Sequence, residues 1–430
     1  MAAGLGTRMR SDLPKHLHPL LGRRMVDWVL QVARELGADP LVVVAAPATA
    51  DAFDGVEVAV QEEPRGTGDA VRSARSTLEG RADEVLVLSG DTPLLTRAVL
   101  DDLLATHRRE DAWATVLSFE PSDPRHYGRV LRDGNRGLTA IVEAHDATEA
   151  ELAIREVNSS IYVFRADRLW PVLDRLTSEN SQDELYLTDS VALLVADGGP
   201  VAVQKGGDPM ETEGVNTRAE LAAAGAALRD RINEEHMLAG VTIVDPQTTW
   251  IEAEVTIAPD AVIHPFTVVQ GATRIAAGAQ VGPHAVLLDV DVGERALVGP
   301  FCYLRPGTVL GAGAKAGTFV EMKNATIGEG TKVPHLSYIG DAEIGDASNI
   351  GAGSITANFP HQPGQPKGKT TIGRNVRVGV DTVFDAPVEV GDYAWTGAGS
   401  VITEDVPPNA LAIARARQVT KEGRGGNRDD

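Results

Sequence analysis

The residues best suited to bind phosphate lie near the start of the chain. The segment from Ala2 to Met9 contains two glycines and Arg8, and Lys15 follows within reach. Glycine lets a backbone approach a phosphate, and free backbone N–H groups together with a cation bind its charge. The segment therefore predicts a phosphate-binding turn between a strand and a helix, although a glycine-rich turn alone is also compatible with an ordinary turn.

A carboxylate suited to a divalent cation follows the apolar run over residues 85–88. Asp91 stands just after this run, and ligands of parallel sheets bind beyond the carboxyl ends of the strands. Asp91 could hold the Mg²⁺ that a nucleotidyl transfer needs, or it could cap the helix predicted to start near Thr96. Gly66-Thr67-Gly68 likewise predicts either a ligand contact or an ordinary helix N-cap.

The third candidate is His335, in the second half of the chain. A neutral imidazole on a rigid scaffold is a suitable general base for deprotonating an amine. Arg305 and Lys323 stand 18 residues apart, which is one coil of the repeat described below, so they should lie above one another and could hold a phosphate. Taken alone, His335 is also compatible with a surface or packed histidine.

The elements that must position the first two candidates alternate between strands and helices. Apolar runs predict strands at Leu41–Ala46, Val56–Gln61, Glu84–Leu88, Ala114–Phe119 and Asn158–Phe164. Apolar residues at helical spacing predict helices over residues 25–36 and 96–110. This alternation favours a largely parallel sheet with helices on both faces. A hairpin is predicted within residues 130–142, and a single helix over residues 217–238.

The second half has a period of six residues. Its first run of aliphatic positions is Ile251, Ile257, Ile263, Val269, Ile275, Val281 and Leu287. A short strand plus a bend gives this period, and three such units make one triangular coil of a β-helix with the aliphatic residues stacked inside. Residues 359–369 break the register and are rich in Pro, Gly and Lys, which predicts a loop leaving the coil. The polar tail 422–430 is predicted to be disordered.

Composition narrows the classes of function. The net charge is −21, which argues against binding a nucleic-acid backbone or an anionic membrane through general electrostatics. The one cysteine, Cys302, excludes an intrachain disulfide, so a reducing cytoplasm is the expected compartment. No apolar run approaches the ~20 residues of a membrane span, and the first residues lack the apolar region of a secretory signal.

Several longer segments carry a family resemblance over nearly the whole chain. They are AAGLGTRMRSDLPKHLHPL, RGTGDA, SGDTPL, YGRV, IVEAHDAT, EGVNTR, LRPGTVLG, FVEMKNATIGEGTKVPHLSYIGDAEIGDASNIGAG and ALAIARARQ. The chain resembles the bacterial bifunctional enzymes N-acetylglucosamine-1-phosphate uridyltransferase / glucosamine-1-phosphate acetyltransferase. The long acetyltransferase stretch is highly specific, whereas sugar-nucleotide pyrophosphorylases in general share only the first motif.

The resemblance implies an architecture and a function. The expected fold is a Rossmann-like α/β nucleotidyltransferase domain with a mostly parallel sheet over residues 1–216, followed by a linker helix over 217–240. A left-handed parallel β-helix of hexapeptide repeats over 241–421 would carry acetyl transfer. The enzyme would acetylate glucosamine-1-phosphate with acetyl-CoA and then transfer uridyl from UTP with release of pyrophosphate. The product, UDP-N-acetylglucosamine, would supply peptidoglycan and cell-wall synthesis.

The resemblance also implies two sets of site residues and a partner. The uridyltransferase site would consist of Ala2, Ala3, Gly4, Lys15, Gln61, Gly66, Thr67, Ser89, Gly90, Asp91, Gly128, Glu143, Asn158 and Asn216. Within it, Asp91 and Asn216 would hold Mg²⁺. The acetyltransferase site would have His335 as base, with the sugar phosphate on Arg305, Lys323, Tyr338 and Asn349. Acetyl-CoA would contact Ala352, Asn358, Phe359, Val380, Ala398 and Arg415. Family members are homotrimers with this second site between neighbouring β-helices.

The chain departs from the family pattern at several positions. Ser89 replaces a usual Tyr, Ser159 stands where Gly is usual, and Val380 stands where Ser is usual. The segment 358–360 is Asn-Phe-Pro instead of a run beginning Asn-Tyr-Asp-Gly. Only residues 1–3 precede Gly4, where a strand of about 5–6 residues is expected. From this we expect weak or absent uridyl transfer beside normal acetyl transfer, and a natural protein that starts several apolar residues earlier.

Two other functions remain open at the level of the sequence. The β-helix could serve only to assemble or regulate a nucleotidyltransferase. Alternatively, the chain could be a non-enzymatic scaffold, as in translation-initiation exchange-factor subunits that join a degenerate nucleotidyltransferase domain to a β-helix. Lys15, Asp91 and Asn216 argue against the scaffold, and His335 with its two neighbouring cations argues against both.

Overall fold

The computed structural model describes residues 1–430 except 5, 125, 135–136, 361–363 and 425–430. The chain divides into two compact units, Met1–Leu228 and Arg229–Asp430. The boundary falls inside helix α8 (Arg218–Leu238), which corresponds to the helix predicted over residues 217–238. Most of the tail predicted to be disordered lies outside the described residues.

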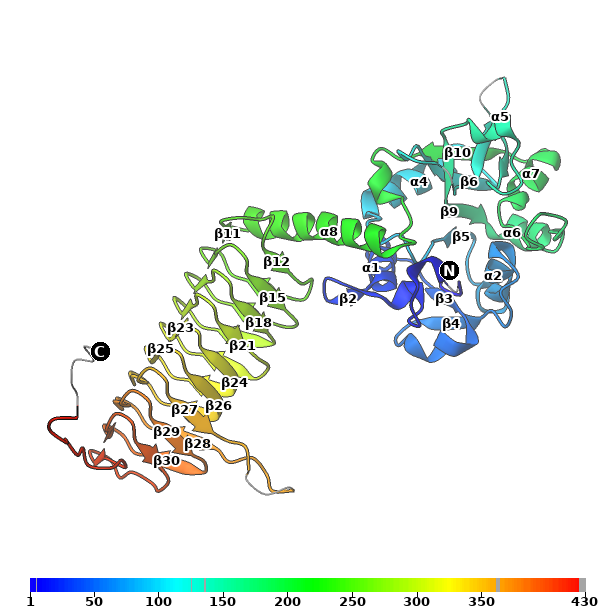
Figure 1. Ribbon diagram of the computed structural model, residues 1–430. Helices are drawn as coiled ribbons and strands as arrows, with labels where there is room; N and C mark the ends of the chain where they lie inside the picture. The colour runs from blue at the N-terminus through cyan, green and yellow to red at the C-terminus, as the bar shows by residue number, and fades with distance from the viewer. Residues whose placement is uncertain (5, 125, 135–136, 361–363, 425–430) are drawn as a thin grey trace, which may run out of the picture. The chain divides into compact units, whose positions relative to one another are not determined.

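Two sheets form the main part of the first unit, and a third, two-stranded sheet pairs β1 (Pro19–Leu20) with β2 (Arg23–Arg24) (Figure 1). The larger sheet has the strand order β10-β6-β9-β7-β8, with β5 pairing with β9. Its members are β5 (Glu84–Val87), β6 (Ala114–Phe119), β7 (Arg129–Arg132), β8 (Leu138–Val142), β9 (Val157–Arg165) and β10 (Val201–Lys205). The second sheet consists of β3 (Val42–Ala45) and β4 (Glu57–Val60), which are parallel. The five predicted strand runs therefore correspond to β3, β4, β5, β6 and β9.

Strand direction in the larger sheet is mixed. β10 runs parallel to β6, whereas β9 runs antiparallel to β5, β6 and β7. The predicted hairpin is the antiparallel pair β7–β8, although residues 135 and 136 at its turn are outside the described residues.

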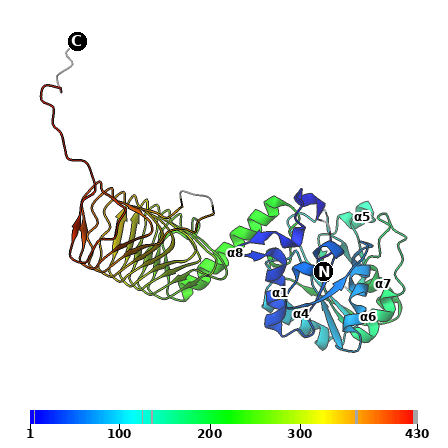
Figure 2. The ribbon, with the colours of Figure 1, turned by 90° about the horizontal axis from the view of Figure 1, so that it is seen from below.

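Helices cover both faces of the larger sheet, as Figure 2 shows. On one side, α1 (Met25–Leu36) and α4 (Arg97–Arg109) pack against β6 and β9, with Leu100, Leu103 and Leu117 in the core. On the other side, α6 (Ala166–Leu173) and α7 (Asp189–Ala196) pack against the same strands. The shorter elements of this unit are η1 (Thr7–Met9), η2 (Lys15–Leu17), β1 (Pro19–Leu20), β2 (Arg23–Arg24), η3 (Pro47–Ala52), α2 (Thr67–Ser73), α3 (Arg75–Leu78), α5 (Glu149–Leu152) and η4 (Pro209–Glu211).

The second unit is a stack of short parallel strands. They are β11 (Thr242–Ile243), β12 (Trp250–Ile251), β13 (Thr256–Ile257), β14 (Val262–Ile263), β15 (Val268–Gln270), β16 (Arg274–Ile275), β17 (Gln280–Val281), β18 (Val286–Leu288), β19 (Val290–Val292), β20 (Leu297–Val298), β21 (Tyr303–Leu304), β22 (Thr308–Leu310), β23 (Lys315–Thr318), β24 (Glu321–Ile327), β25 (Lys332–His335), β26 (Tyr338–Ile344), β27 (Ile355–Ala357), β28 (Thr370–Ile372), β29 (Val383–Asp385), β30 (Val388–Val390), β31 (Trp395–Thr396), β32 (Val401–Ile402) and β33 (Leu411–Ala412).

The six-residue period corresponds to this stack. Val269 pairs with Ile251 on the coil before it and with Leu287 on the coil after it, so three units of six residues make one coil. The aliphatic residues of the predicted register are buried, for example Ile263 and Val281 at 0% exposure. The predicted fold class, a nucleotidyltransferase-type α/β domain followed by a β-helix, is confirmed.

One loop leaves the β-helix between β27 and β28 (Figure 1). The Gly368 N–H donates to the Asn358 carbonyl over 3.0 Å and so closes the base of the loop. This is the predicted loop over 359–369, of which residues 361–363 lie outside the described part. Among the helices in the described part of the chain, none has the length and apolar character needed to cross a membrane.

Candidate active sites

A cavity of about 250 Å³ lies at the carboxyl ends of β4 and β5. The predicted residues that line it are Ala2, Ala3, Gly4, Lys15, Gln61, Gly66, Thr67, Ser89, Gly90 and Asp91. These residues come from distant parts of the first unit, and the sheet brings them to one edge. Gly128, Glu143, Asn158 and Asn216 are not part of this lining.

Asp91 is the charged centre of the cavity. Its carboxylate pairs with the Lys15 ammonium and accepts a hydrogen bond of 2.6 Å from the Ser89 hydroxyl. Burial by itself would raise the pKa of the Asp91 carboxyl, but Lys15 and Ser89 outweigh burial and hold this pKa below its ordinary value. Helix α4 is capped instead by Thr96, whose hydroxyl accepts from the Val99 N–H, so Asp91 is not the helix cap.

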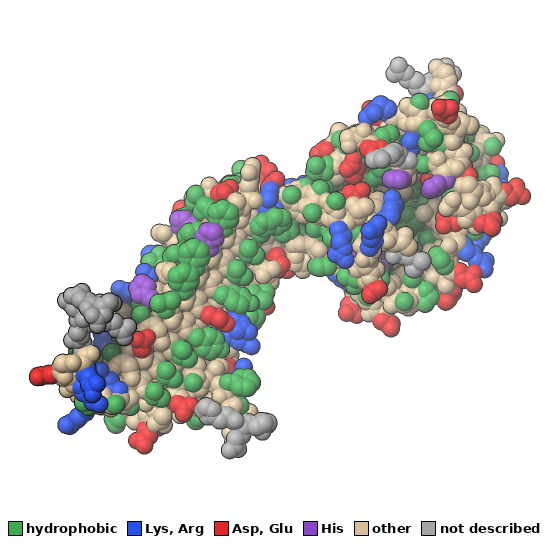
Figure 3. Space-filling view, viewed as in Figure 1, with side chains coloured by type: hydrophobic (Ala, Val, Ile, Leu, Met, Phe, Trp, Pro, Cys, Tyr) green, Lys and Arg blue, Asp and Glu red, His purple; other side chains and the backbone are tan. Residues whose placement is uncertain are grey.

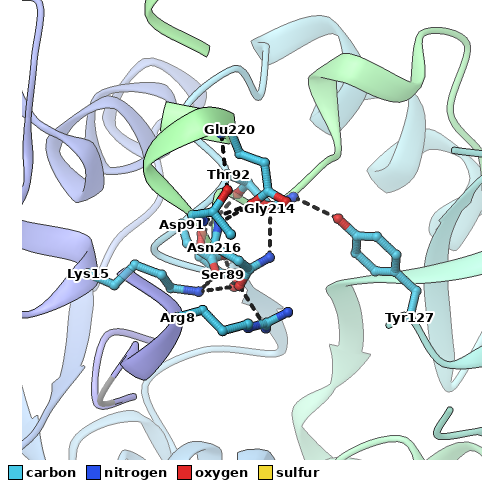
Figure 4. Close-up of polar contacts among 10 residues, drawn as sticks. Arg8, Lys15, Ser89, Asp91, Thr92, Tyr127, Gly214, Asn216 and Glu220 are labelled. Atoms are coloured by element: carbon cyan, nitrogen blue, oxygen red, sulfur yellow. Dashed lines mark hydrogen bonds and ion pairs between the residues drawn. The ribbon is translucent and has the colours of Figure 1, made fainter. Parts of the chain in front are cut away.

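Asn216 joins the same group of side chains (Figure 4). Its Oδ1 accepts hydrogen bonds from Lys15 Nζ at 2.8 Å and from Arg8 at 3.0 Å. Its backbone N–H donates to Glu220 at the start of α8, over 2.6 Å. The oxygens of Asp91 and Asn216 therefore face one cationic group, although 125 positions separate the two residues in the sequence (216 − 91).

Gly66 forms the turn that leads into α2. Its φ of 104° lies in the region that favours glycine, and a Cβ at this position would lie 2.6 Å from the Leu185 carbonyl oxygen. The same carbonyl accepts from the Gly68 N–H at 2.8 Å. The Thr67 hydroxyl accepts from the Leu187 N–H at 3.0 Å. The predicted helix start is thus observed, and the turn is tied to residues 185–187.

Three of the remaining predicted residues form a second group. The Asn158 N–H donates to the Gly128 carbonyl at 2.9 Å, and a Cβ at Gly128 would lie 3.4 Å from a Glu143 carboxylate oxygen. Burial raises the pKa of the Glu143 carboxyl, which accepts from the Thr188 hydroxyl at 3.0 Å. Gly128, Glu143 and Asn158 are therefore brought together.

The sequence did not single out several residues of the first site. His16, Ser160 and Glu184 line the cavity, and the Tyr127 hydroxyl accepts from the Gly214 N–H at 3.2 Å (Figure 4). Burial raises the pKa of Tyr127 to about 12. His16 and Tyr127 lie within segments that carry the family resemblance, but nothing in those segments marks either side chain for the site. Ser160 and Glu184 lie in no such segment, and only the folded chain brings them to the cavity.

The predicted acetyltransferase residues lie on both sides of one corner of the β-helix. His335 ends β25 and Tyr338 begins β26, and Leu336 between them turns the chain with a φ of 49°. Arg305 follows β21 and Lys323 lies in the next coil, because the Arg305 N–H donates to the Met322 carbonyl at 2.9 Å. The predicted stacking of Arg305 and Lys323 is thus observed.

Charged and amide side chains surround this corner. Arg305 pairs with Glu321 at 2.7 Å. Asp341 accepts from Asn324 at 2.6 Å and also from the buried Asn358 amide. Within the described part of the chain, no hydrogen bond or ion pair joins the exposed His335 imidazole to these groups. Asn349 lies one coil beyond Lys332, to which it is bridged.

A column of backbone bonds connects His335 to three residues predicted to contact acetyl-CoA. The Gly353 N–H donates to the His335 carbonyl at 3.3 Å, Asp381 donates to Ala352 at 2.7 Å, and Gly399 donates to Val380 at 2.8 Å. Each bond runs between the same two positions of successive coils. The members of the column are therefore His335, Ala352, Val380 and Ala398. Phe359 and Arg415 are exposed, and the Lys367 ammonium lies 5.9 Å from the Phe359 ring centre.

Comparison with known proteins identifies the family. Residues 1–186 match the MobA-like NTP transferase domain. The chain is 50% identical to the bifunctional protein GlmU of Mycolicibacterium paratuberculosis, over 98% of this chain and 91% of that protein. It is 49% identical to bifunctional protein GlmU of Streptomyces avermitilis, over 98% and 92%. The chain belongs to the GlmU family.

The family assignment confirms several predictions. The predicted enzyme, a bifunctional transferase of UDP-N-acetylglucosamine synthesis with uridyltransferase and acetyltransferase activities, is confirmed at the level of the family. Its substrates are accordingly nucleotide, sugar phosphate and acetyl-CoA. The two alternatives, an assembly-only β-helix and a non-enzymatic scaffold, are not favoured. The individual site residues stay predictions.

Proposed function

We propose that the cavity at Asp91 is where the sugar-1-phosphate oxygen attacks the α-phosphorus of UTP and pyrophosphate leaves. The observation that carries this proposal is the convergence of Asp91, Asn216, Lys15 and Arg8 at the carboxyl end of β5. Lys15 and Arg8 would bind the phosphates, and the glycine-rich segment would approach them with free N–H groups. Gly128, Glu143 and Asn158 would hold the sugar.

The donor atoms near Asp91 fit Mg²⁺. One carboxylate and one amide oxygen are hard ligands, and both already face a positive charge at Lys15 Nζ. Among the described residues no group of three or more His, Cys, Asp or Glu could hold a metal. This suits Mg²⁺, which is often bound through one or two carboxylates plus substrate phosphates. Mg²⁺ held there would offset charge developing on the transferred group.

The test of this site is the variant Asp91→Ala. It should reduce Mg²⁺-dependent uridyl transfer at least ~100-fold, as is typical when an electrostatic catalytic group is lost. Acetyl transfer should be unchanged, because the second unit has its own core. Asp101→Ala, at an exposed ion pair on α4, is the matched control. Retained uridyl transfer in Asp91→Ala, measured as pyrophosphate release, would contradict the assignment.

For the second unit, we propose that His335 removes a proton from the amine of glucosamine-1-phosphate as the amine nitrogen attacks the thioester carbonyl carbon of acetyl-CoA. The C–S bond then breaks, and coenzyme A leaves as the thiol after taking up the proton from His335. Arg305 and Lys323 would hold the sugar phosphate, and Tyr338 and Asn349 would orient the amine. Support comes from the column of His335, Ala352, Val380 and Ala398, which would bring base and thioester to the same corner. Asn358, Phe359 and Arg415 would contact the rest of acetyl-CoA.

We also propose that the chain works as a homotrimer. An exposed ladder of side chains runs along the corner next to this column: Phe266, His284, Phe301, Phe319 and Leu336. The first four rings stack with centroid distances of 4.7, 4.8 and 5.2 Å. Hydrophobic side chains are exposed at many places on the visible face of the β-helix (Figure 3). Such a contiguous apolar surface is typical of an interface, and closed symmetry is the usual outcome.

The compartment is a further part of the proposal. The chain has one cysteine, Cys302, and it is buried and free. A protein without disulfides suits a reducing compartment. We therefore propose that the enzyme acts in the cytoplasm.

A further inference from the structure

Strand β9 is irregular where it passes the cavity at Asp91. Its ladder with β6 shifts register, so that only residue 117 of β6 stands opposite residues 159–161 of β9. β9 therefore bulges at these residues, and Ser160 is the middle one. A bulge beside an active site often redirects a side chain.

Ser160 is the residue that the bulge presents to the cavity. Every residue of β9 is buried except Ser160 and the terminal Arg165, and Ser160 lines the cavity together with Asp91. The neighbouring strand agrees with this placement. β5 runs antiparallel to β9 as far as the pair of Val87 with Tyr162, so Ser160 lies at the end of the sheet where β5 leads to Asp91.

The backbone of Ser160 is held in an unusual conformation. Its φ of 61° lies in the left-handed region, which costs energy for a residue with a side chain. The Ser160 N–H donates to Asn158 Oδ1 at 3.1 Å. The buried Ser159 hydroxyl donates to the Leu117 carbonyl at 2.8 Å and accepts from the Ile161 N–H at 3.3 Å. These bonds fix the bulge without the Ser160 side chain, so glycine would fit the position with less strain.

The Ser160 hydroxyl is not used by the folded chain. Among the described residues, no hydrogen bond joins this hydroxyl to another group. A serine hydroxyl can donate one hydrogen bond and accept two, so this one is available to a ligand in the cavity. Backbone strain of this kind is concentrated at functional sites.

The surroundings of Ser160 indicate which part of a ligand it would meet. Its N–H bonds to Asn158, and Asn158 in turn bonds to Gly128, in the group proposed above to hold the sugar. The cavity that Ser160 lines also contains Lys15 and Asp91, which are proposed to act at the phosphates. In a sugar 1-phosphate the ring follows the phosphate directly. A side chain that adjoins both groups would therefore meet a polar group of the sugar.

We propose that Ser160 is a further specificity-determining residue, whose hydroxyl hydrogen-bonds a polar group of the N-acetylglucosamine sugar. The inference rests on the proposed uridyl transfer at the Asp91 cavity, and it adds one sugar contact to those of Gly128, Glu143 and Asn158. The bulge holds the hydroxyl in one place, so a sugar without a matching polar group would leave it unpaired. A site of this kind selects among sugars by the hydrogen bonds that they can make.

Ligand binding to the full chain tests this contact without depending on turnover. Calorimetry with UDP-N-acetylglucosamine and with UDP, both with Mg²⁺ present, separates the sugar from the nucleotide. Ser160→Ala keeps the backbone strain and loses the hydroxyl. Its Kd for UDP-N-acetylglucosamine should rise roughly three- to tenfold, as expected for one neutral hydrogen bond, and its Kd for UDP should not change. Ser76→Ala removes an exposed hydroxyl on α3 and is the matched control, which should bind both ligands as the parent does.

A second variant, Ser160→Gly, separates binding from a structural role. It also lacks the hydroxyl, but it relieves the strain of the positive φ. Its first unit should therefore unfold at no lower denaturant concentration than that of the parent, while UDP-N-acetylglucosamine binds as weakly as to Ser160→Ala. Weaker binding by a variant that is no less stable is the result expected of a lost contact.

The possible results separate this contact from the proposed reaction. Unchanged binding of UDP-N-acetylglucosamine by either variant overturns the sugar contact and leaves the proposed reaction standing. Equal weakening for UDP and for UDP-N-acetylglucosamine also overturns it, because the contact would then be to the nucleotide. A parent chain that binds neither ligand overturns the proposed site, and the sugar contact with it.

Discussion

At the scale of single residues, the first site is organised around one cation. Lys15 Nζ contacts both Asp91 and Asn216, and Arg8 reaches Asn216 from the other side. The positive charge of Lys15 keeps the Asp91 carboxyl ionised in spite of burial. An ionised carboxylate can bind a metal cation without first losing a proton. Its negative charge also repels a phosphate placed next to it. If Mg²⁺ takes the Asp91 and Asn216 oxygens as proposed, Lys15 would be free to contact the substrate phosphates instead.

The role proposed for His335 gives a prediction at the same scale. His335→Ala should lower the rate of acetyl transfer by ~10²–10⁴-fold, the usual cost of losing a general base. Uridyl transfer by the same protein serves as the internal control and should not change. Initial rates with glucosamine-1-phosphate and acetyl-CoA measure the effect. A variant with near-normal acetyl transfer would show that another group accepts the proton.

His16 gives a prediction about pH. It is 4% exposed, and among the described residues its buried Nε2 has no hydrogen-bond partner. Burial together with nearby positive charges lowers its pKa to about 4. Between that value and ~6.5, the pKa of an unfolded histidine, the unfolded chain binds the extra proton. Stability of the first unit should therefore be full above about pH 6.5 and fall as the pH drops toward 4, by roughly 3 kcal/mol in total.

Denaturant unfolding of the first unit at a series of pH values between 7 and 4 measures this loss. His16→Phe keeps a ring against Phe53, with which His16 stacks at 6.0 Å, but cannot titrate. The variant should lose less stability than the parent over the same interval. Identical pH profiles for the two proteins would mean that His16 is not responsible.

At the scale of elements, the sequence predicts the structure best where the same pattern of buried residues repeats along the chain. Every aliphatic residue of the six-residue register points into the β-helix, because each coil imposes the same burial pattern. Strands β3, β5 and β6 were predictable from short apolar runs for a similar reason. The meeting of Lys15 with Asn216 was not predictable from spacing, because it depends on how α8 and the first turns pack. The position of Ser160 in the cavity lining was not predictable either, because it depends on a local backbone turn with a φ of 61°.

The turn before α2 gives the prediction for this scale. Gly66→Ala places a Cβ 2.6 Å from the Leu185 carbonyl, so the loop must move and uridyl transfer should fall at least ~10-fold, as misplaced positioning groups typically cause. Gly80→Ala is the matched control, because Gly80 also has a positive φ of 77° but meets nothing within 4 Å. It should cost only about 1 kcal/mol of stability and leave activity intact. Steady-state kinetics of both variants distinguish a clash from simple backbone strain.

At the scale of the whole molecule, the two units have separate cores. Leu228 packs in the first half of α8 with residues of the first unit, whereas Asn233 in the second half donates to the carbonyls of Pro246 and Thr249 at 2.9 and 3.0 Å. Each half of one helix therefore belongs to its own unit. Changes at the Asp91 cavity should not reach the His335 corner through shared packing, which is why the two activities serve as controls for one another.

The assembly of the β-helix gives the last prediction. The ladder leaves Phe266, Phe301, Phe319 and Leu336 between 47% and 63% exposed, and covering such surface contributes about 25 cal/mol per Å². Replacing Phe301 and Phe319 together with Asp should dissociate the proposed trimer, because association would bury two charges without partners. Acetyl transfer should fall with it, since the proposed site lies between subunits.

Val309→Asp, at a partly exposed strand position outside the ladder, is the control and should remain trimeric. Sedimentation velocity measures the state of each protein. A monomeric parent with full acetyl transfer would refute the assembly, and a trimeric double variant would remove the ladder from the interface.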